Sequence, residues 1–302
     1  MCMGATVIDS APQVAALGTI LGIWAHPDDE AYLSGGLMAW ARDLGSRVVC
    51  VTATRGELGT SDPVTWPPHR LALERSRELA RSLDILGVSE HHWLDYRDGE
   101  CAAVPQAHAV ARLSRIMSRV QPDTVLTFGP DGITGHSDHQ AVSGWATSAF
   151  GRAAQPGARL LYAAVPEPRA VRWSALDESL GVYLPGYPVT VPADRLAVDV
   201  ALDPVTASRK VAALQAQATQ TNELLRVLGS ECYTTWVSDE SFIESAAGSR
   251  RAGTHDVSRC SIASRARSRT SALPTGTSWG TSGGGGNWAA GTTVGAAGAS
   301  GA

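Results

Sequence analysis

Two short runs of the sequence gather histidine and carboxylate side chains that could hold a metal ion. They are Ala25–Glu30, with the sequence AHPDDE, and Gly135–His139, with the sequence GHSDH. A catalytic zinc site uses three protein ligands, usually imidazole nitrogens and carboxylate oxygens, and keeps one position open for water. We expect His26, Asp29 and His139 to be the ligands, because the first two lie three residues apart and the third approaches from another strand.

The remaining polar residues of both runs predict how a bound metal would be used. Asp28 has no ligand duty, so its carboxylate could accept a proton from the metal-bound water as general base. When this water attacks an amide carbonyl, negative charge builds on the oxygen, and a protonated His136 could stabilise it together with the metal. Asp138 could orient an imidazole or raise its basicity, and which histidine it contacts stays open. The pattern favours metal-dependent hydrolysis with Asp28, His136 and Asp138 as catalytic residues.

The elements around both runs predict a sheet that brings them together. Strand-like and helix-like stretches alternate along the first half of the chain, with strands expected at 19–24, 47–52, 92–94 and 124–128 and helices at 32–44, 70–86 and 110–120. This alternation is typical of an α/β fold with a mostly parallel sheet and helices on both faces. Each run directly follows a strand, so both should lie where the carboxyl ends of the strands converge.

The second half of the chain predicts fewer elements and a change of composition. Further strands are expected at 159–165 and 196–202, a helix at 204–228, and the end of the fold near Phe242. Beyond that point, Arg and Ser and then Gly, Ala, Ser and Thr dominate, and such a segment buries too little apolar area to offset its ordering entropy. We therefore predict an N-terminal extension at 1–17, one domain at 18–245 and a disordered tail at 246–302.

The overall composition favours a globular protein with a small-molecule substrate. The chain has 302 residues, 44% of them hydrophobic, and a formal net charge of -4, so it lacks the basic face expected of a nucleic-acid or anionic-membrane binder. Its five cysteines are scattered without a C-x-x-C pair, which fits a reducing cytoplasm. The N-terminal stretch lacks a charged segment and a long apolar run, so we expect no signal peptide and no membrane span.

Together, the two motifs resemble the LmbE-like family of deacetylases, which includes the PIG-L enzyme of glycolipid-anchor synthesis and the deacetylase and conjugate amidase of mycothiol metabolism. The resemblance is strongest from Ile20 to Ala146 and continues less clearly to about Phe242. It implies a Rossmann-like fold, one zinc ion per chain, and hydrolysis of an N-acyl group on an amino sugar such as N-acetylglucosamine. It also implies the same metal ligands, general base and oxyanion-stabilising histidine as the chemistry above.

The same resemblance implies three substrate-binding residues. Glu57 lies in the loop TRGELG after the second strand, Arg75 lies where the family has a sugar- or phosphate-contacting arginine, and Asp98 offers a carboxylate to a hydroxyl group. Arg75 could instead be a surface arginine paired with Glu78, and Asp98 could be a turn residue before Gly99.

Three other functions stay open. An amidase of larger amides, such as thiol-sugar conjugates, would differ in the loop 55–68 and in the less well matched C-terminal third. A nucleotide-binding protein would need G-x-G-x-x-G after the first strand, where this chain has His-Pro-Asp-Asp. A metal-binding protein without catalysis would have no use for Asp28. The proposed ligand set would also accept iron, cobalt or manganese.

Overall fold

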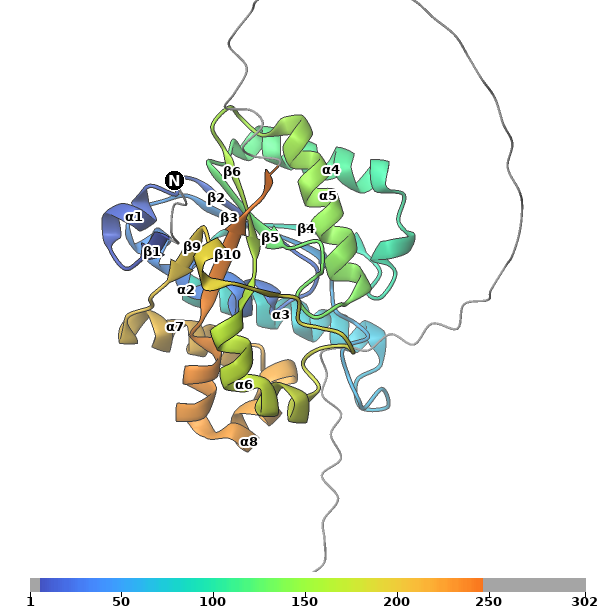
Figure 1. The fold of residues 1–302 in the computed structure, drawn as a ribbon. Helices are drawn as coiled ribbons and strands as arrows, with labels where there is room; N and C mark the ends of the chain where they lie inside the picture. Colours follow the sequence, from blue (N-terminus) through green and yellow to red (C-terminus); the bar gives the residue numbers. More distant parts are fainter. Residues whose placement is uncertain (1–5, 247–302) are drawn as a thin grey trace, which may run out of the picture.

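The computed structural model describes residues 6–246 of the chain (Figure 1). Its strands are β1 (Thr6–Ile8), β2 (Ile20–Trp24), β3 (Val48–Thr54), β4 (Glu90–Tyr96), β5 (Thr124–Phe128), β6 (Arg159–Ala163), β7 (Val165–Pro166), β8 (Thr190–Val191), β9 (Val198–Val200) and β10 (Glu240–Glu244). Its α-helices are α1 (Ala11–Ala15), α2 (Asp29–Asp43), α3 (Pro68–Leu86), α4 (Gln106–Val120), α5 (Ser137–Ala153), α6 (Glu167–Leu180), α7 (Pro204–Gln215) and α8 (Ala218–Val237). Two short 3-10 helices cover Cys101–Ala103 and Ala193–Arg195.

Eight strands form one sheet in the order β1-β9-β10-β6-β5-β2-β3-β4. Within the described residues, β10 is antiparallel to its neighbours β9 and β6, and the other pairings of this sheet are parallel. β7 and β8 pair separately. The predicted α/β fold with a mostly parallel sheet is confirmed.

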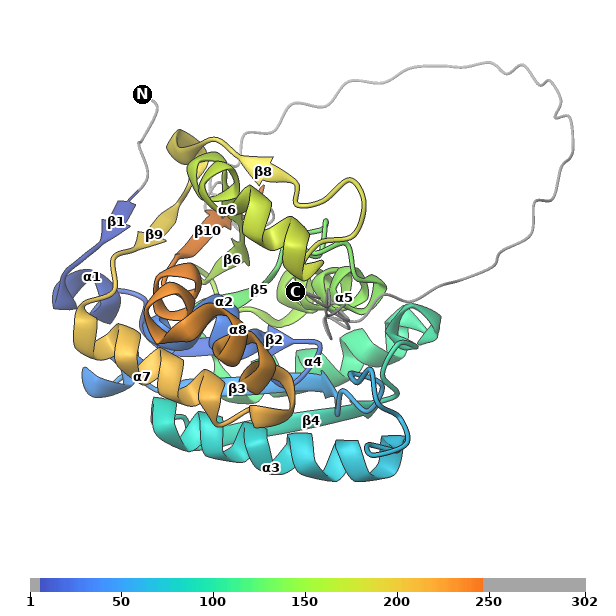
Figure 2. The ribbon, with the colours of Figure 1, turned by 90° about the horizontal axis from the view of Figure 1, so that it is seen from below.

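Helices cover both faces of the sheet, as Figures 1 and 2 show. α4 and α5 pack together on one face, and α2, α3 and α7 pack together on the other. Strands enclosed in this way lose contact with water on both sides, so they favour continuous apolar runs. β2, with the sequence ILGIW, and β5, with the sequence TVLTF, are accordingly buried at every residue.

The strand order reverses direction at β2. From β2 the chain continues to β3 on one side, and it later returns to β5 on the other side of β2. Such a reversal separates the loops that follow the two strands, and ligands of open α/β sheets bind in the crevice between them. The loops after β2 and β5 carry the two motifs.

Several elements differ from the sequence-based expectation. The single helix expected at 204–228 is wrong, because the chain turns at Gln217 and forms two helices, α7 and α8. α5 and α6 were not expected, and α5 begins inside the second motif. β1 lies in the expected N-terminal extension yet pairs with β9. The domain boundaries stay a prediction, and residues 247–302 of the predicted tail lie outside the described residues.

No helix within residues 6–246 is both long enough and apolar enough to cross a membrane.

Candidate metal centre and active site

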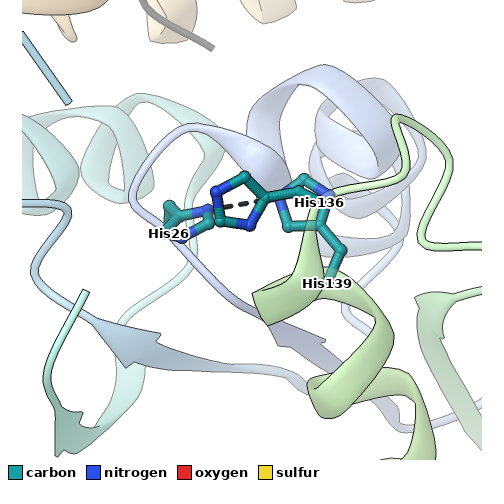
Figure 3. A group of neighbouring side chains, drawn as sticks. All are labelled: His26, His136 and His139. Carbon is teal, nitrogen blue, oxygen red and sulfur yellow. Dashed lines mark hydrogen bonds between the residues drawn. The ribbon is translucent and has the colours of Figure 1, made fainter. Parts of the chain in front are cut away.

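The three predicted metal ligands lie together at the carboxyl ends of β2 and β5. Figure 3 shows two of them, His26 and His139, with His136 beside them. His26 Nδ1 lies 3.1 Å from His139 Nε2. The Asp29 carboxylate closes the triangle, with Oδ2 3.6 Å from His26 Nδ1 and Oδ1 3.5 Å from His139 Nε2. All three side chains are buried. Two imidazole nitrogens and one carboxylate this close together are a donor set that suits a divalent transition metal.

His136 lies beside this triangle, with its ring centroid 4.9 Å from that of His26 and 5.1 Å from that of His139. The three histidines offer nitrogens within 4.8 Å of one another, so His136 could also approach a metal held by the other two. The Asp138 backbone N–H donates to His136 Nδ1 over 3.1 Å. A nitrogen that accepts cannot carry a hydrogen, so the proton of a neutral His136 ring lies on Nε2.

The orientation of His139 is fixed by its second ring nitrogen and by stacking. His139 Nδ1 lies 3.0 Å from the carbonyl oxygen of Gly132, to which it can donate. The His139 ring also stacks on Phe128, with the centroids 4.1 Å apart. Because a backbone carbonyl accepts only from a protonated nitrogen, Nε2 is the atom left for the metal.

His26 is oriented by two buried carboxylates. Its Nε2 lies 3.1 Å from Asp98 Oδ1 and 3.3 Å from Asp138 Oδ2. Asp138 also accepts from the backbone N–H groups of Gly99 and Cys101, over 2.8 and 3.0 Å. The histidine that Asp138 contacts through its side chain is therefore His26, whereas its backbone N–H contacts His136.

Asp28 occupies an unusual backbone conformation beside the triangle. It precedes α2 with φ 109° and ψ -33°, a region that residues other than glycine seldom adopt. Arg75 Nη2 donates to Asp28 Oδ2 over 3.1 Å and also to the carbonyl oxygen of Pro27, and Nη1 donates to that of Gly56 over 2.9 Å. Arg75 is 3% exposed, so its interpretation as a surface partner of Glu78 is wrong.

The other two substrate-binding candidates contact each other. Glu57 Oε1 accepts from the Asp98 backbone N–H over 3.1 Å, and Asp98 Oδ2 accepts from that of Leu58 over 2.9 Å. Glu57 Oε2 is buried and has no hydrogen-bond partner among residues 6–246. Asp98 does lie in a turn, which the Glu100 backbone N–H closes by donating to the carbonyl oxygen of Arg97 over 3.1 Å, and its side chain also lies beside His26. Substrate binding by Glu57, Arg75 and Asp98 stays a prediction.

The site buries more acidic than basic groups, and this shifts their pKa values. Burial raises the pKa of Asp28 to about 7 against the opposing effect of Arg75, and burial likewise raises the pKa of Asp29. Burial also lowers the pKa of His139, whereas in His26 the nearby carboxylates, above all Asp98, outweigh burial and raise the pKa. Asp28 and Asp29 hold their charge poorly, which fits a site that receives a divalent cation. In Asp98 and Asp138 the contact with His26 outweighs burial and lowers the pKa.

Two buried residues of this region were not assigned a role from the sequence. Glu30 Oε2 accepts from the Asp28 backbone N–H, and Glu30 Oε1 accepts from Gln217 Nε2. Burial raises the pKa of Glu30 to about 8. A glutamate in the first turn of a helix is a known signal for a contact with the preceding backbone, but nothing near Gln217 in the sequence indicates its partner.

Comparison with known proteins places these motifs in a family. A family model described as PIG-L, GlcNAc-PI de-N-acetylase, matches residues 21–150. The protein named 1D-myo-inositol 2-acetamido-2-deoxy-alpha-D-glucopyranoside deacetylase from Kineococcus radiotolerans is 35% identical over 49% of this chain and 48% of its own length. Its namesake from Nakamurella multipartita is 35% identical over 67% of this chain and 79% of its own length. The chain thus spans about half of the first relative and most of the second.

Solved structures agree on the fold. The N,N'-diacetylchitobiose deacetylase from Pyrococcus horikoshii matches with a TM-score of 0.52 and 23% identity, covering 76% of this chain and 84% of that one. The A40926 pseudoaglycone deacetylase Dbv21 matches with a TM-score of 0.54 and 20% identity, covering 76% and 97%. At this identity, the likeness supports the fold alone. On the family model and the relatives together, this chain belongs to the PIG-L family, as its motifs predict.

Proposed function

We propose that this protein is a metal-dependent hydrolase that removes the N-acetyl group from a small molecule containing an amino sugar. The observation that carries the proposal is the convergence of His26, Asp29 and His139, with the Asp28 carboxylate beside them. Relatives named for deacetylation of a 2-acetamido-2-deoxy-glucopyranoside support the substrate class. The expected products are the free amine and acetate.

The metal would be held by His26, Asp29 and His139, one ion per chain. Zinc fits these donors best, and iron, cobalt or manganese are alternatives. When bound, the ion supplies Lewis acidity to the acyl carbonyl and to the attacking water. Asp98 and Asp138 hold the His26 ring by its other nitrogen, which keeps Nδ1 turned toward the Asp29 carboxylate and His139 Nε2.

Asp28 acts as the general base in this proposal. It accepts a proton from the water that forms the new C–O bond, and it returns this proton to the nitrogen as the C–N bond breaks. A general base works best when its pKa is near the working pH, and burial raises the pKa of Asp28 to about 7. Arg75 keeps the Asp28 carboxylate in place through Oδ2, which leaves Oδ1 for the water.

His136 stabilises the oxygen on which negative charge develops. The Asp138 backbone N–H occupies Nδ1, so Nε2–H is the donor that faces the reacting carbonyl. This requires only a neutral ring, whereas the sequence suggested a protonated one. Asp138 thus supports both histidines, His136 through its backbone and His26 through its side chain.

Among the three substrate-binding candidates, Glu57 keeps an acceptor for a sugar hydroxyl. Its buried Oε2 has no hydrogen-bond partner in the part of the chain described. Glu57 is also one of the residues that line a cavity of about 380 Å³, together with Arg55, His69, Tyr96 and Arg97. Arg75 and Asp98 are committed to Asp28 and His26. They would act on the substrate mainly through those two residues.

Acetate release tests this function directly. The purified protein is incubated with N-acetylglucosamine glycosides before and after chelation, and its metal content is determined on the same sample. Chelator-sensitive release with about one metal per chain supports the proposal. Bound metal with cleavage of only a bulky amide would replace the deacetylase with the amidase, and absence of metal binding would rule out the site. The cytoplasmic location expected from the cysteines stays a prediction.

A further inference from the structure

We propose that Glu30 and Gln217 are positioning residues for Asp28: together they hold its backbone in the positive-φ conformation that aims its carboxylate at the site. This inference rests on the general-base role proposed for Asp28. It assigns a part in the reaction to Gln217, which lies beyond the matched segment 21–150.

Asp28 needs support because its conformation is unfavourable. With φ 109° it lies outside the regions that residues with a Cβ normally populate, and such a conformation persists only where the surroundings enforce it. Relaxation to a negative φ would rotate the side chain away from its present direction. A shift of about 1 Å in a reacting group can cost on the order of a hundredfold in rate.

Glu30 and Arg75 hold Asp28 from two ends. Glu30 Oε2 accepts from the Asp28 backbone N–H over 3.0 Å, while Arg75 holds the Asp28 carboxylate and the preceding carbonyl oxygen of Pro27. Glu30 is fully buried, so water does not compete for its oxygens. The backbone contact from Glu30 restrains φ, and the Arg75 contact restrains the side chain.

Glu30 is held in turn from the opposite end of the chain. Gln217 Nε2 donates to Glu30 Oε1 over 2.7 Å, and Ser82 Oγ from α3 lies 3.4 Å from the same oxygen. Gln217 is fully buried at the junction of α7 and α8. Its N–H donates to Leu214, and its carbonyl accepts from Gln220 and Thr221, so its backbone is anchored to both helices.

The first test substitutes Gln217 by leucine, which keeps the approximate volume and removes the amide. We expect Gln217→Leu to lower kcat about tenfold, with KM and metal content unchanged. Thr124→Val is the matched control. It removes a buried hydroxyl that donates to Leu17 over 2.8 Å at the amino end of β5, at the far edge of the sheet from the site. We expect Thr124→Val to lower the stability of the protein about as much as Gln217→Leu does, and to leave kcat unchanged.

Glu30 is tested by two variants that differ in their hydrogen bonds. Glu30→Leu should lower kcat about a hundredfold, because nothing then accepts from the Asp28 N–H. Glu30→Gln should restore most of the activity, since its carbonyl oxygen can accept from Asp28 and its amide can donate to Gln217 Oε1, an atom without a partner among residues 6–246. If Glu30→Leu does not fold, the proposal is still tested by the kcat values of the other two variants. It requires a lower kcat in Gln217→Leu than in Glu30→Gln.

A second readout does not depend on turnover. In metal-free protein, amide hydrogen exchange at Asp28 should be faster in Gln217→Leu than in the wild type, and unchanged in Thr124→Val. In an Asp28→Ala background, adding Gln217→Leu should lower kcat no further. The proposal would be overturned if Gln217→Leu left the exchange at Asp28 unchanged, or if its kcat were no lower than that of Thr124→Val. If the wild-type protein bound metal but released no acetate, the proposed function would fail, while the exchange result would still report on the backbone of Asp28.

Discussion

Two buried clusters of charged groups pack against α2, and they differ in how their charges balance. Along the first half and middle of the helix, Lys210 Nζ and Glu240 Oε1 lie 2.7 Å apart with both side chains fully buried. Lys210 also donates to the carbonyl oxygen of Tyr32, and Glu240 accepts from the N–H groups of Gly36 and Leu37. One positive and one negative charge thus cancel, and backbone groups saturate both.

At the front of α2 the charges do not cancel. Asp28, Asp29 and Glu30 follow one another, and Arg75 forms an ion pair with Asp28 alone among these three acids. Burial raises the pKa of all three acids, whereas it lowers the pKa of Lys210 against the attraction of Glu240. From this contrast we infer that the balanced buried pair stabilises the fold, whereas the unbalanced group is completed by a ligand.

The largest effect is expected from Asp28→Asn, which keeps the size of the side chain and removes its basicity. We expect kcat to fall by about 10²–10⁴-fold, because a positioned base contributes that much. Metal content should stay at the wild-type value, since Asp28 is not among the proposed ligands. If the variant lost its metal as well as its turnover, Asp28 would be a metal ligand, and the roles proposed for Asp28 and Asp29 would be wrong.

Breaking the balanced pair should affect stability and spare catalysis. Lys210→Met leaves Glu240 as a buried charge without its cation, which typically costs about 3–5 kcal/mol. We expect this loss in the free energy of unfolding measured by urea denaturation. At a temperature where the variant is folded, kcat per folded molecule should equal that of the wild type. A variant of wild-type stability would mean that this cluster does not hold the fold.

Asp98→Asn tests the support of a metal ligand within the unbalanced cluster. The substitution weakens the contact that orients His26, and partners of metal-bound histidines typically account for about 10–100-fold in metal affinity. Competition with a chelator of known affinity measures this change. An unchanged metal affinity would transfer the orienting role to Asp138, the second carboxylate beside His26 Nε2.

The smallest effect is expected from an exposed charge outside both clusters. Asp203 caps α7 by accepting from the N–H groups of Val205 and Thr206, and hydrogen bonds with Thr206 lower its pKa. Asp203→Ala should therefore cost about 1 kcal/mol near pH 7. Because the folded-state pKa is the lower one, the contribution is present above the unfolded-state pKa and is lost as the pH falls through the folded-state value. Urea unfolding at neutral and acidic pH measures the decrease, and a difference independent of pH would contradict it.

The sequence predicted which motif residues lie close together better than it predicted the residues that support them. His26, Asp29 and His139 could be expected to meet, because residues directly after parallel strands meet at one edge of a sheet. The burial of Arg75 also had a local signal that was overlooked. It lies four residues from both Leu71 and Leu79, so it shares their buried face of α3. Gln217 had no such signal, because its partner Glu30 lies 187 positions away.

The missed helices have a different cause. α5 starts at Ser137, within a motif whose residues were interpreted as ligands on a loop, so its first turn was not recognised as a helix start. His136 is the residue that caps it. His136 therefore both caps a helix and lies in the site. The local sequence pattern alone does not show which of these two roles a residue has, or that it has both.

The position of β10 affects how the molecule must be assembled during synthesis. β10 is the last strand described, yet it lies between β9 and β6 in the interior of the sheet. The first strand, β1, reaches the rest of the sheet only through β9 and β10. On the ribosome, β2 to β6 can pair as they emerge, whereas β1 must wait for nearly the whole chain. The first described strand is therefore among the last to pair, and a nascent chain that stalls before Glu240 leaves the sheet in two pieces.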